Sequence, residues 1–207
     1  TSTGCHNTFI GQNAGRCTTF GSYNFFTGRC AGMKNTTGSN NIFFGYYAGR
    51  DITTGTENIG IGKSSTVLIT TGCNNVAIGV QSAQLITTGK YNVALGNLAG
   101  QYLSNGNYNV YIGKDAGRFY SNRVGVIAIG RCAAGTGLSQ GNYSISIGHF
   151  AGCYGTNRAS ISIGSFAGKG SAGCCNINIG HEVGCCFLVG CDNITIGRRG
   201  SIYNTGN

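Results

Sequence analysis

One pattern of apolar and polar positions recurs about every 17 residues along this chain. In its clearest copy, which begins at Asn41, an asparagine precedes a short apolar run that closes on a glycine, and Asn58 opens the next copy. A fixed short period is typical of a protein built from stacked repeats. The closing glycines of successive copies are Gly11, Gly28, Gly45, Gly62, Gly79, Gly96, Gly113, Gly130, Gly148, Gly164, Gly180 and Gly197.

Two columns of mostly β-branched residues flank the middle of each apolar run. They hold the residue before the closing glycine and the residue two places earlier, as in Ile61 and Ile59. Residues two apart share one face of an extended strand, and Ile and Val favour strands. We therefore expect these two columns to form the buried core.

The residue between these two columns is then expected to point outward. This middle column holds no charged residue in twelve copies, and its large aromatic members are Phe9, Phe26, Phe43 and Tyr111. An uncharged aromatic surface is typical of a covered face. Two interpretations stay open: a face through which chains associate, most simply in a parallel trimer, or the second wall of a flattened coil.

Small and turn-forming residues separate the apolar runs. An Ala-Gly pair such as Ala48-Gly49 follows the closing glycine, and a Thr-Thr-Gly such as Thr53 to Gly55 comes later. Gly and Asn tolerate the left-handed backbone of tight turns. One short strand per unit cannot bury a core alone, whereas coils stacked at ~4.8 Å can.

We therefore predict an all-β fold, a parallel β-solenoid (β-roll or β-helix) of about twelve 17-residue coils. It occupies residues 1–207 as a single repeat domain without terminal caps. An antiparallel sandwich fits poorly, because it needs hairpins and alternating strand directions. Since both ends fall within a bend of the repeat, we expect either flanking protein or copies stacked head to tail.

Composition agrees with an elongated structural protein. The chain has 38 glycines, no proline and 9% charged residues, against roughly 25% charged residues in an average globular domain. It contains no run of 18 apolar residues, so the sequence predicts no membrane insertion.

The net charge of +9 is arranged in columns. The basic residues that directly follow a closing glycine are Arg29, Lys63, Lys114, Arg131 and Arg198. Such a stripe could contact a polyanion, for example an anionic surface glycan, or it could simply keep a rod of low charge soluble. Tyr46, Tyr47 and Arg50 are further candidate glycan contacts, and we do not expect nucleic acid as a partner.

Eleven cysteines are placed irregularly. We place Cys175 and Cys191 in one column of successive copies, which would bring their Cα atoms within disulfide range. We predict a disulfide between them. The odd total indicates that other thiols are free or bonded between chains.

Catalytic and metal-binding patterns are weak. The five carboxylates form no pair in one column of adjacent copies, and the cysteine spacing does not match a zinc site. The segment Gly60 to Ser64 lacks the first glycine of a phosphate loop. We predict a protein that is not an enzyme and has no catalytic residues, cofactor or metal.

The repeat resembles glycine-rich repeats of phage and giant-virus fibre proteins. It is also similar to the Asn-x-Val-Ala-Ile-Gly repeat of trimeric autotransporter adhesin heads, which residues Asn75 to Gly79 match. The resemblance implies a parallel β-roll, often trimeric and left-handed, that serves as a shaft or adhesive surface.

Three functions follow as expectations. The first is a rigid structural fibre, extracellular or on a virion surface, formed by association of copies of this chain as a trimer or a head-to-tail filament. The alternative is an adhesin or receptor-binding shaft that recognises anionic glycans. The less favoured third is an ice-binding protein, because Thr-Thr pairs recur in five successive copies, but adjacent strand residues face opposite sides and leave one outward Thr per coil.

Overall fold

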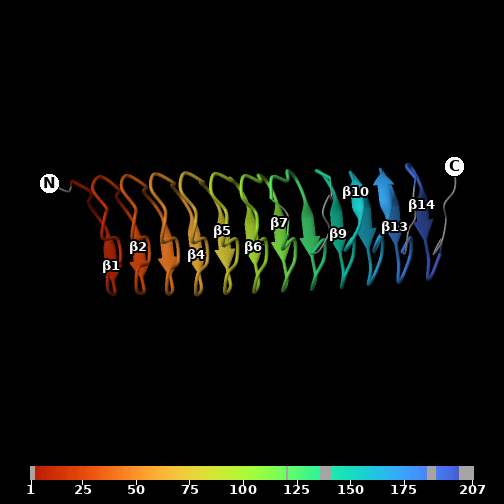
Figure 1. The fold of residues 1–207 in the computed structure, drawn as a ribbon, viewed down its shortest axis with the longest axis horizontal. Helices are drawn as coiled ribbons and strands as arrows, with labels where there is room; N and C mark the ends of the chain where they lie inside the picture. The colour runs from red at the N-terminus through yellow and green to blue at the C-terminus, as the bar shows by residue number, and fades with distance from the viewer. Residues whose placement is uncertain (1–2, 120, 136–140, 186–189, 201–207) are drawn as a thin grey trace.

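The chain winds into an elongated parallel β-solenoid (Figure 1). The computed structural model describes residues 3–119, 121–135, 141–185 and 190–200, apart from the side chains of residues 156 and 157. Strand β1 (Thr8–Ile10) lies near one end of the rod and β14 (Ile194–Ile196) near the other. The described residues form strands and turns without a helix, as the repeat predicts.

Twelve three-residue strands form one parallel sheet along the rod. Their order follows the chain, and each residue pairs with the residue of its own column, as Ile59 does with Val76. The predicted solenoid is confirmed. The strands between β1 and β14 in this sheet are β2 (Phe25–Thr27), β3 (Ile42–Phe44), β4 (Ile59–Ile61), β5 (Val76–Ile78), β6 (Val93–Leu95), β7 (Val110–Ile112), β8 (Ile127–Ile129), β9 (Ile145–Ile147), β11 (Ile161–Ile163) and β13 (Ile177–Ile179).

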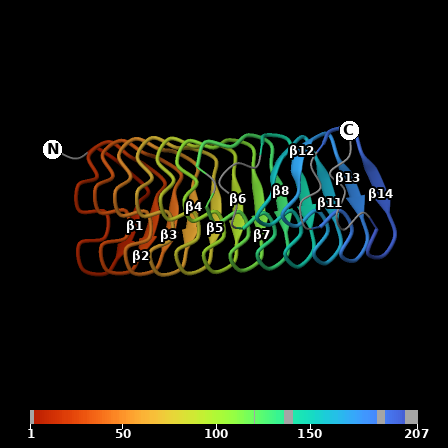
Figure 2. The same ribbon diagram turned by 45° about the vertical axis from the view of Figure 1, so that its right-hand side comes forward.

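A second sheet was not predicted from the repeat. It consists of two parallel strands, β10 (Thr156–Arg158) and β12 (Ala172–Cys174), in the C-terminal coils. Figure 2 shows the successive coils stacked in register on the strand side and on the returning side.

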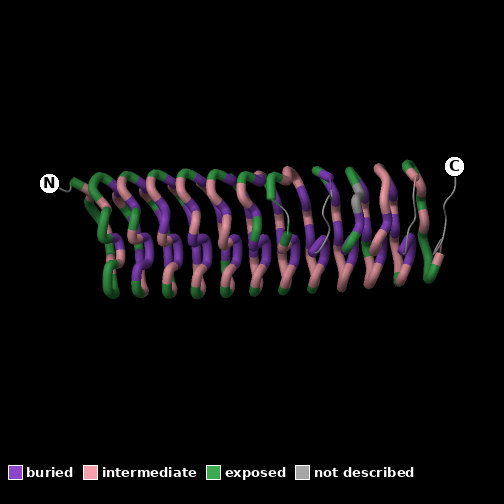
Figure 3. The backbone as a smooth tube through the Cα atoms, in the orientation of Figure 1, coloured by how far each residue is buried: buried purple, intermediate pink, exposed green. Residues whose placement is uncertain are grey.

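The predicted core orientation was wrong, because the middle residue of each strand points inward. Phe26, Phe43 and Tyr111 are fully buried, whereas Ile42 and Phe44, on either side of Phe43, are 40% and 52% exposed. A three-residue strand sends only one side chain into the narrow interior, where it meets the returning half of the coil. Buried segments therefore recur from coil to coil along most of the rod, between intermediate and exposed ones (Figure 3).

The proposed association face thus lies in the core. Phe9, in the first described strand, is half-buried and stacks on Phe26 at 5.1 Å between ring centroids. Phe26 stacks in turn on Phe43 at 5.2 Å. Of the two interpretations that the sequence left open, the structure therefore agrees better with a wall of the coil than with an association face. The middle column forms an inner wall.

Side-chain size is matched across this interior. The residue four places after a closing glycine packs against the middle column, and a Cβ on Gly15 would lie 2.6 Å from the ring of Phe9. In β4 the order of sizes is reversed, because the middle residue is Gly60 and Thr66 takes the place of the glycine. Where one of these two positions carries a large side chain, the other is therefore small.

A ladder of buried asparagines runs beside the core. The asparagine before each strand from β2 to β7 donates to its counterpart in the preceding coil, as Asn75 does when its backbone N–H and Nδ2 donate to Asn58 Oδ1. Its Nδ2 also donates a hydrogen bond of 2.8 Å to the Gly89 carbonyl oxygen. The ladder is continuous from Asn7 to Asn109, and Val126 occupies the next rung.

The closing glycines have a backbone that other residues rarely adopt. Gly45 has φ +137°, and a Cβ there would lie 2.6 Å from the carbonyl oxygen of Gly62 in the next coil. Glycine at this position lets the coils stack at sheet spacing.

Candidate functional site

A largely apolar surface of the rod is the outer side of the twelve-stranded sheet. We call it the outer face; it consists of the first and last residue of each strand of that sheet. Its 24 positions hold 22 apolar residues and two threonines, and none is charged. Its most exposed large members are Ile10, Phe25, Ile42, Phe44, Ile78, Ile163, Ile194 and Ile196.

An apolar surface of this extent is unusual on a soluble monomer. Scattered exposed apolar residues need no explanation, but contiguous patches mark sites of interaction. Here the patch follows the whole sheet, because the strand alternation that sends Phe43 inward sends Ile42 and Phe44 outward.

A second surface runs beside the turn that precedes the strands, and we call it the tyrosine groove. Its first hollow has a volume of about 530 Å³, and the next hollow along the rod has about 300 Å³. The first is lined by Thr71, Thr88, Lys90, Tyr91, Asn105, Asn107 and Tyr108, and the second by Arg123, Gly141, Asn142, Tyr143, Arg158 and Ala159.

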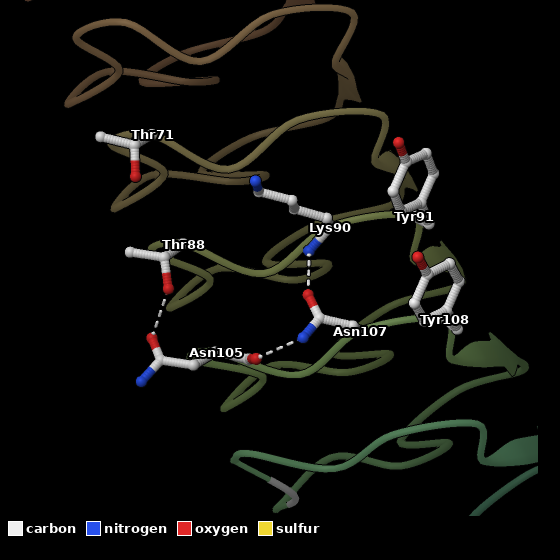
Figure 4. A pocket seen from close by; sticks show the side chains of 7 residues that line it. All are labelled: Thr71, Thr88, Lys90, Tyr91, Asn105, Asn107 and Tyr108. Atoms are coloured by element: carbon white, nitrogen blue, oxygen red, sulfur yellow. Dashed lines mark hydrogen bonds between the residues drawn. The ribbon is translucent and has the colours of Figure 1, made fainter.

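Figure 4 shows the first hollow between a threonine row and a tyrosine pair, with Lys90 extending between them. Tyr91 and Tyr108 stack with ring centroids 5.1 Å apart and planes 5° from parallel. The Thr88 hydroxyl group donates a hydrogen bond of 2.9 Å to Asn105 Oδ1. The Lys90 backbone N–H donates one of 2.8 Å to Asn107 Oδ1. These bonds fix the walls and leave the Lys90 ammonium group directed into the hollow.

The second hollow repeats this arrangement with arginines. The Val124 backbone N–H donates a hydrogen bond of 3.1 Å to Asn142 Oδ1, just as the Lys90 backbone N–H donates one to Asn107 Oδ1. Tyr143 lies over Gly125, where a Cβ would come 2.8 Å from the tyrosine ring. Arg123 stands in a column that is otherwise mostly glycine, so its long side chain adds a positive charge to the wall.

The groove tyrosines have a left-handed backbone, with φ of 57° at Tyr91, 58° at Tyr108 and 61° at Tyr143. Residues of every type in this column share that conformation, including Glu57 and Asn74. The conformation is therefore a property of the coil. It turns the column outward, and the cross-coil bond from Tyr108 N–H to the Lys90 carbonyl, 3.0 Å, holds it.

The predicted polyanion contacts Arg29, Lys63, Lys114, Arg131 and Arg198 are all exposed and lie along one corner of the rod. Only Lys114 and Arg131 are neighbours in adjacent coils. The others are separated by one or more uncharged residues or histidines of the same column: Tyr46, Val80, Asn97, His149, Ser165 and His181.

The further candidate contacts near this corner are partly neutralised. Arg29 lies over the Tyr46 ring and Arg50 over the Tyr47 ring, at 5.7 and 5.2 Å. Arg50 also binds Asp51 at 2.6 Å, and Lys34 binds the same carboxylate at 2.9 Å.

Asp51 is correspondingly stabilised in its charged form. Burial raises the pKa of Asp51, but hydrogen bonds and charge from Arg50 and Lys34 outweigh burial and hold that pKa below its ordinary value. The positive charges of Lys34 and Arg50 are therefore paired with Asp51 within the protein.

The predicted disulfide was displaced by one residue. Cys191 bonds Cys174, with Cα atoms 4.6 Å apart, while Cys175 carries an exposed free thiol. The step between Gly180 and Gly197 is 17 residues, so Cys174 and not Cys175 shares the column of Cys191.

The predicted single rank of outward threonines is confirmed in the coils that carry it. Thr37, Thr54, Thr71 and Thr88 are exposed. Their neighbours Thr36, Thr53, Thr70 and Thr87 donate side-chain hydrogen bonds to backbone carbonyls of the next coil.

Neither a metal cluster nor a membrane-crossing helix occurs in the part of the chain that the structure describes. There, no three His, Cys, Asp or Glu side chains gather as metal ligands. Within the same residues, no helix has the length and apolar character that crossing a membrane requires.

Comparisons with protein families, curated proteins and solved structures gave no match for this chain.

Sequence reasoning missed the tyrosine groove. A signal was present, since Tyr23, Tyr91, Tyr108 and Tyr143 all stand five places before a closing glycine. Arg123 and Arg158 gave no such signal, because they stand in columns that hold mostly glycine or small polar residues.

Proposed function

We propose that this protein is a structural rod that associates side by side with copies of itself to form a fibre, outside a cell or on a virion surface. The observation that carries this proposal is the outer face, which is uncharged over all twelve strands and apolar at 22 of its 24 positions, while many of its large side chains are exposed. The sequence analysis expected association through Phe9, Phe26, Phe43 and Tyr111. The outer face takes that role here.

A copy of the same chain is the partner that fits this face best. The outer face presents two rows of mostly β-branched side chains that repeat at the coil spacing, ~4.8 Å. A parallel copy has the same spacing, so its rows can interdigitate over the full length of the sheet. Two or three copies around a shared axis would cover the face and leave the polar groove and the basic corner in solvent.

The disulfide supports a location outside the cytoplasm. Cys174 and Cys191 are bonded, and disulfides persist mainly in oxidising surroundings such as cell and virion surfaces.

The test is the mass of the assembly in solution. Sedimentation equilibrium of the wild-type chain should give a dimer or trimer. Ile78→Lys places a charge in the middle of the outer face, at a side chain already 41% exposed, and should shift the mass toward the monomer. Thr54→Lys adds the same charge at an exposed position of another surface and should leave the mass unchanged.

Circular dichroism of each variant distinguishes dissociation from unfolding. A wild-type chain that sediments as a monomer up to its solubility limit would overturn the proposal. So would Ile78→Lys and Thr54→Lys variants that dissociate to the same extent.

A further inference from the structure

We infer that the tyrosine groove binds a linear anionic glycan, with Lys90, Arg123 and Arg158 as the contacts to its acidic groups. This site differs from the basic corner predicted from the sequence, and it does not rest on the association of copies through the outer face.

The three positive charges are regularly spaced along the rod. Lys90, Asn107 and Val124 are paired in successive coils, and Asn142 and Arg158 continue their column. Arg123 continues the neighbouring column after Gly89 and Gly106. One positive charge therefore recurs every second coil, or about every 10 Å at sheet spacing.

This periodicity suits a linear polyanion better than a single small anion. An extended acidic polysaccharide such as heparin carries at least one acidic group in each disaccharide, and its disaccharides repeat at a comparable interval. A rigid ladder of coils holds the matching cations in place, so little ordering entropy is lost on binding.

The groove has no opposing charge. Neither hollow is lined by a carboxylate, and Lys90, Arg123 and Arg158 form no ion pair among the residues that the structure describes. This contrasts with Arg50, Arg118 and Arg199, each of which binds an acidic side chain. The three groove cations are therefore free to contact a ligand.

Neutral hydrogen-bonding groups lie between the charges. Asn105 accepts bonds from Thr87 and Thr88 through Oδ1, so its Nδ2 group remains as a donor for a ligand. Thr71 is exposed in the same wall. Hydroxyl and amide groups of this kind match the hydroxyl groups that a glycan carries between its acidic groups.

The tyrosine geometry favours a glycan over a single-stranded nucleic acid. Proteins that bind single strands offer free aromatic faces on which bases stack. Tyr91 and Tyr108 each cover one face of the other at 5.1 Å between ring centroids, which leaves no room for a base between them. Their exposed edges and hydroxyl groups instead border the groove, as Figure 4 shows.

Heparin oligosaccharides of defined length, a neutral dextran and a single-stranded DNA of matched charge are suitable probes for isothermal titration of the purified chain. Heparin should bind, its affinity should rise with chain length until the groove is filled, and it should fall steeply with added salt. Dextran should not bind, and the DNA should bind more weakly than heparin.

The decisive comparison uses two variants with equal loss of charge. Arg123→Gln with Arg158→Gln should weaken heparin binding about tenfold or more. Lys114→Gln with Arg131→Gln removes two exposed charges from the basic corner and should change the affinity no more than about twofold.

Equal losses in the two double variants would overturn the inference, because binding would then reflect net charge alone. DNA that binds as tightly as heparin and depends on the same two arginines would replace the glycan by a nucleic acid. The Ile78→Lys variant, if it is monomeric, should retain heparin binding, so the outcome is independent of the assembly experiment.

Discussion

The asparagine ladder should contribute more to stability than any exposed feature of the rod, and Asn58→Ala tests this. Asn58 is fully buried. Its Nδ2 group donates to Asn41 Oδ1 and to the carbonyls of Thr56 and Gly72, at 3.1, 3.0 and 2.8 Å. Its Oδ1 accepts from the backbone N–H and Nδ2 of Asn75. Alanine removes all five bonds.

The expected loss follows from the groups left behind. A typical hydrogen bond contributes ~1 kcal/mol net, and a buried donor or acceptor left without a partner costs ~1–3 kcal/mol. The substitution leaves the Asn75 N–H without its acceptor and the Gly72 carbonyl without this donor. Because such terms are not additive, we expect Asn58→Ala to lower the free energy of unfolding by ~3–5 kcal/mol.

The chain supplies a matched control in Asn109. Its side chain makes three of these bonds, two from Nδ2 to Asn92 Oδ1 and the Arg123 carbonyl, and one accepted from the Val126 N–H. The next rung, Val126, has no side-chain amide, so Asn109→Ala should cost less than Asn58→Ala. Thr54→Ala, at an exposed side chain, should change the free energy of unfolding by less than ~0.5 kcal/mol.

Urea unfolding followed by circular dichroism gives these differences, with the slope of each transition compared between variants. A changed slope would indicate that coils unfold in separate segments, as repeat proteins can. A cost below ~1 kcal/mol for Asn58→Ala, or a larger cost for Asn109→Ala, would refute the view that ladder bonds stabilise the coil.

Three further changes test single contacts. Asp51→Asn should lower the free energy of unfolding by ~1 kcal/mol at neutral pH. The wild type should lose this stability as the pH falls through the lowered pKa of Asp51, and the variant should not, as thermal melts at a series of pH values would show. Tyr111→Phe should be neutral or stabilising by ~1 kcal/mol in urea unfolding, since its buried hydroxyl has no partner among the described residues. Cys191→Ser removes the disulfide to Cys174 and should lower the free energy of unfolding by ~3 kcal/mol. Reductant should destabilise the wild type but not this variant.

The period of the repeat determines the fold, and both the period and the register of the strands could be read from the sequence. Strict columns of Gly, Asn and Ile at one spacing require parallel strands that pair residue by residue, as Ile59 and Val76 do. The unpredicted strands β10 and β12 occur where the steps shorten to 16 residues, so the turn before β11 and β13 changes its geometry.

The orientation of the strands was misjudged because hydrophobicity alone was used to assign the core. The informative signal was the pairing of sizes within each unit. Phe43 is followed six residues later by Gly49, whereas Gly60 is followed six residues later by Thr66. Only residues that share an interior volume need such compensation, so this pairing would have identified the middle column as buried.

The candidate sites were harder to predict, since they depend on which columns meet at the surface. Tyr91 and Lys90 are adjacent in the sequence, but the hollow that they line also needs Asn107 and Thr71 from neighbouring coils. The basic corner was visible because its residues share one column, while Arg123 and Arg158 come from two columns. A search one column at a time misses a groove that lies between columns.

The distribution of apolar volume within the coil gives a physical reason for association. The interior of this rod holds large side chains such as Phe43 in some coils, but in others the middle column is as small as Ala77 or Ala94, and the polar asparagine ladder runs beside it. Most of the Ile and Val residues lie on the outer face. Fully burying one such side chain contributes ~1.5–3 kcal/mol, and members such as Ile10 and Ile78 are about half exposed. Covering the eight most exposed members would recover about 1 kcal/mol each. A single coil stack therefore leaves much of its hydrophobic stabilisation unused, and a parallel copy could supply it without any change in the fold.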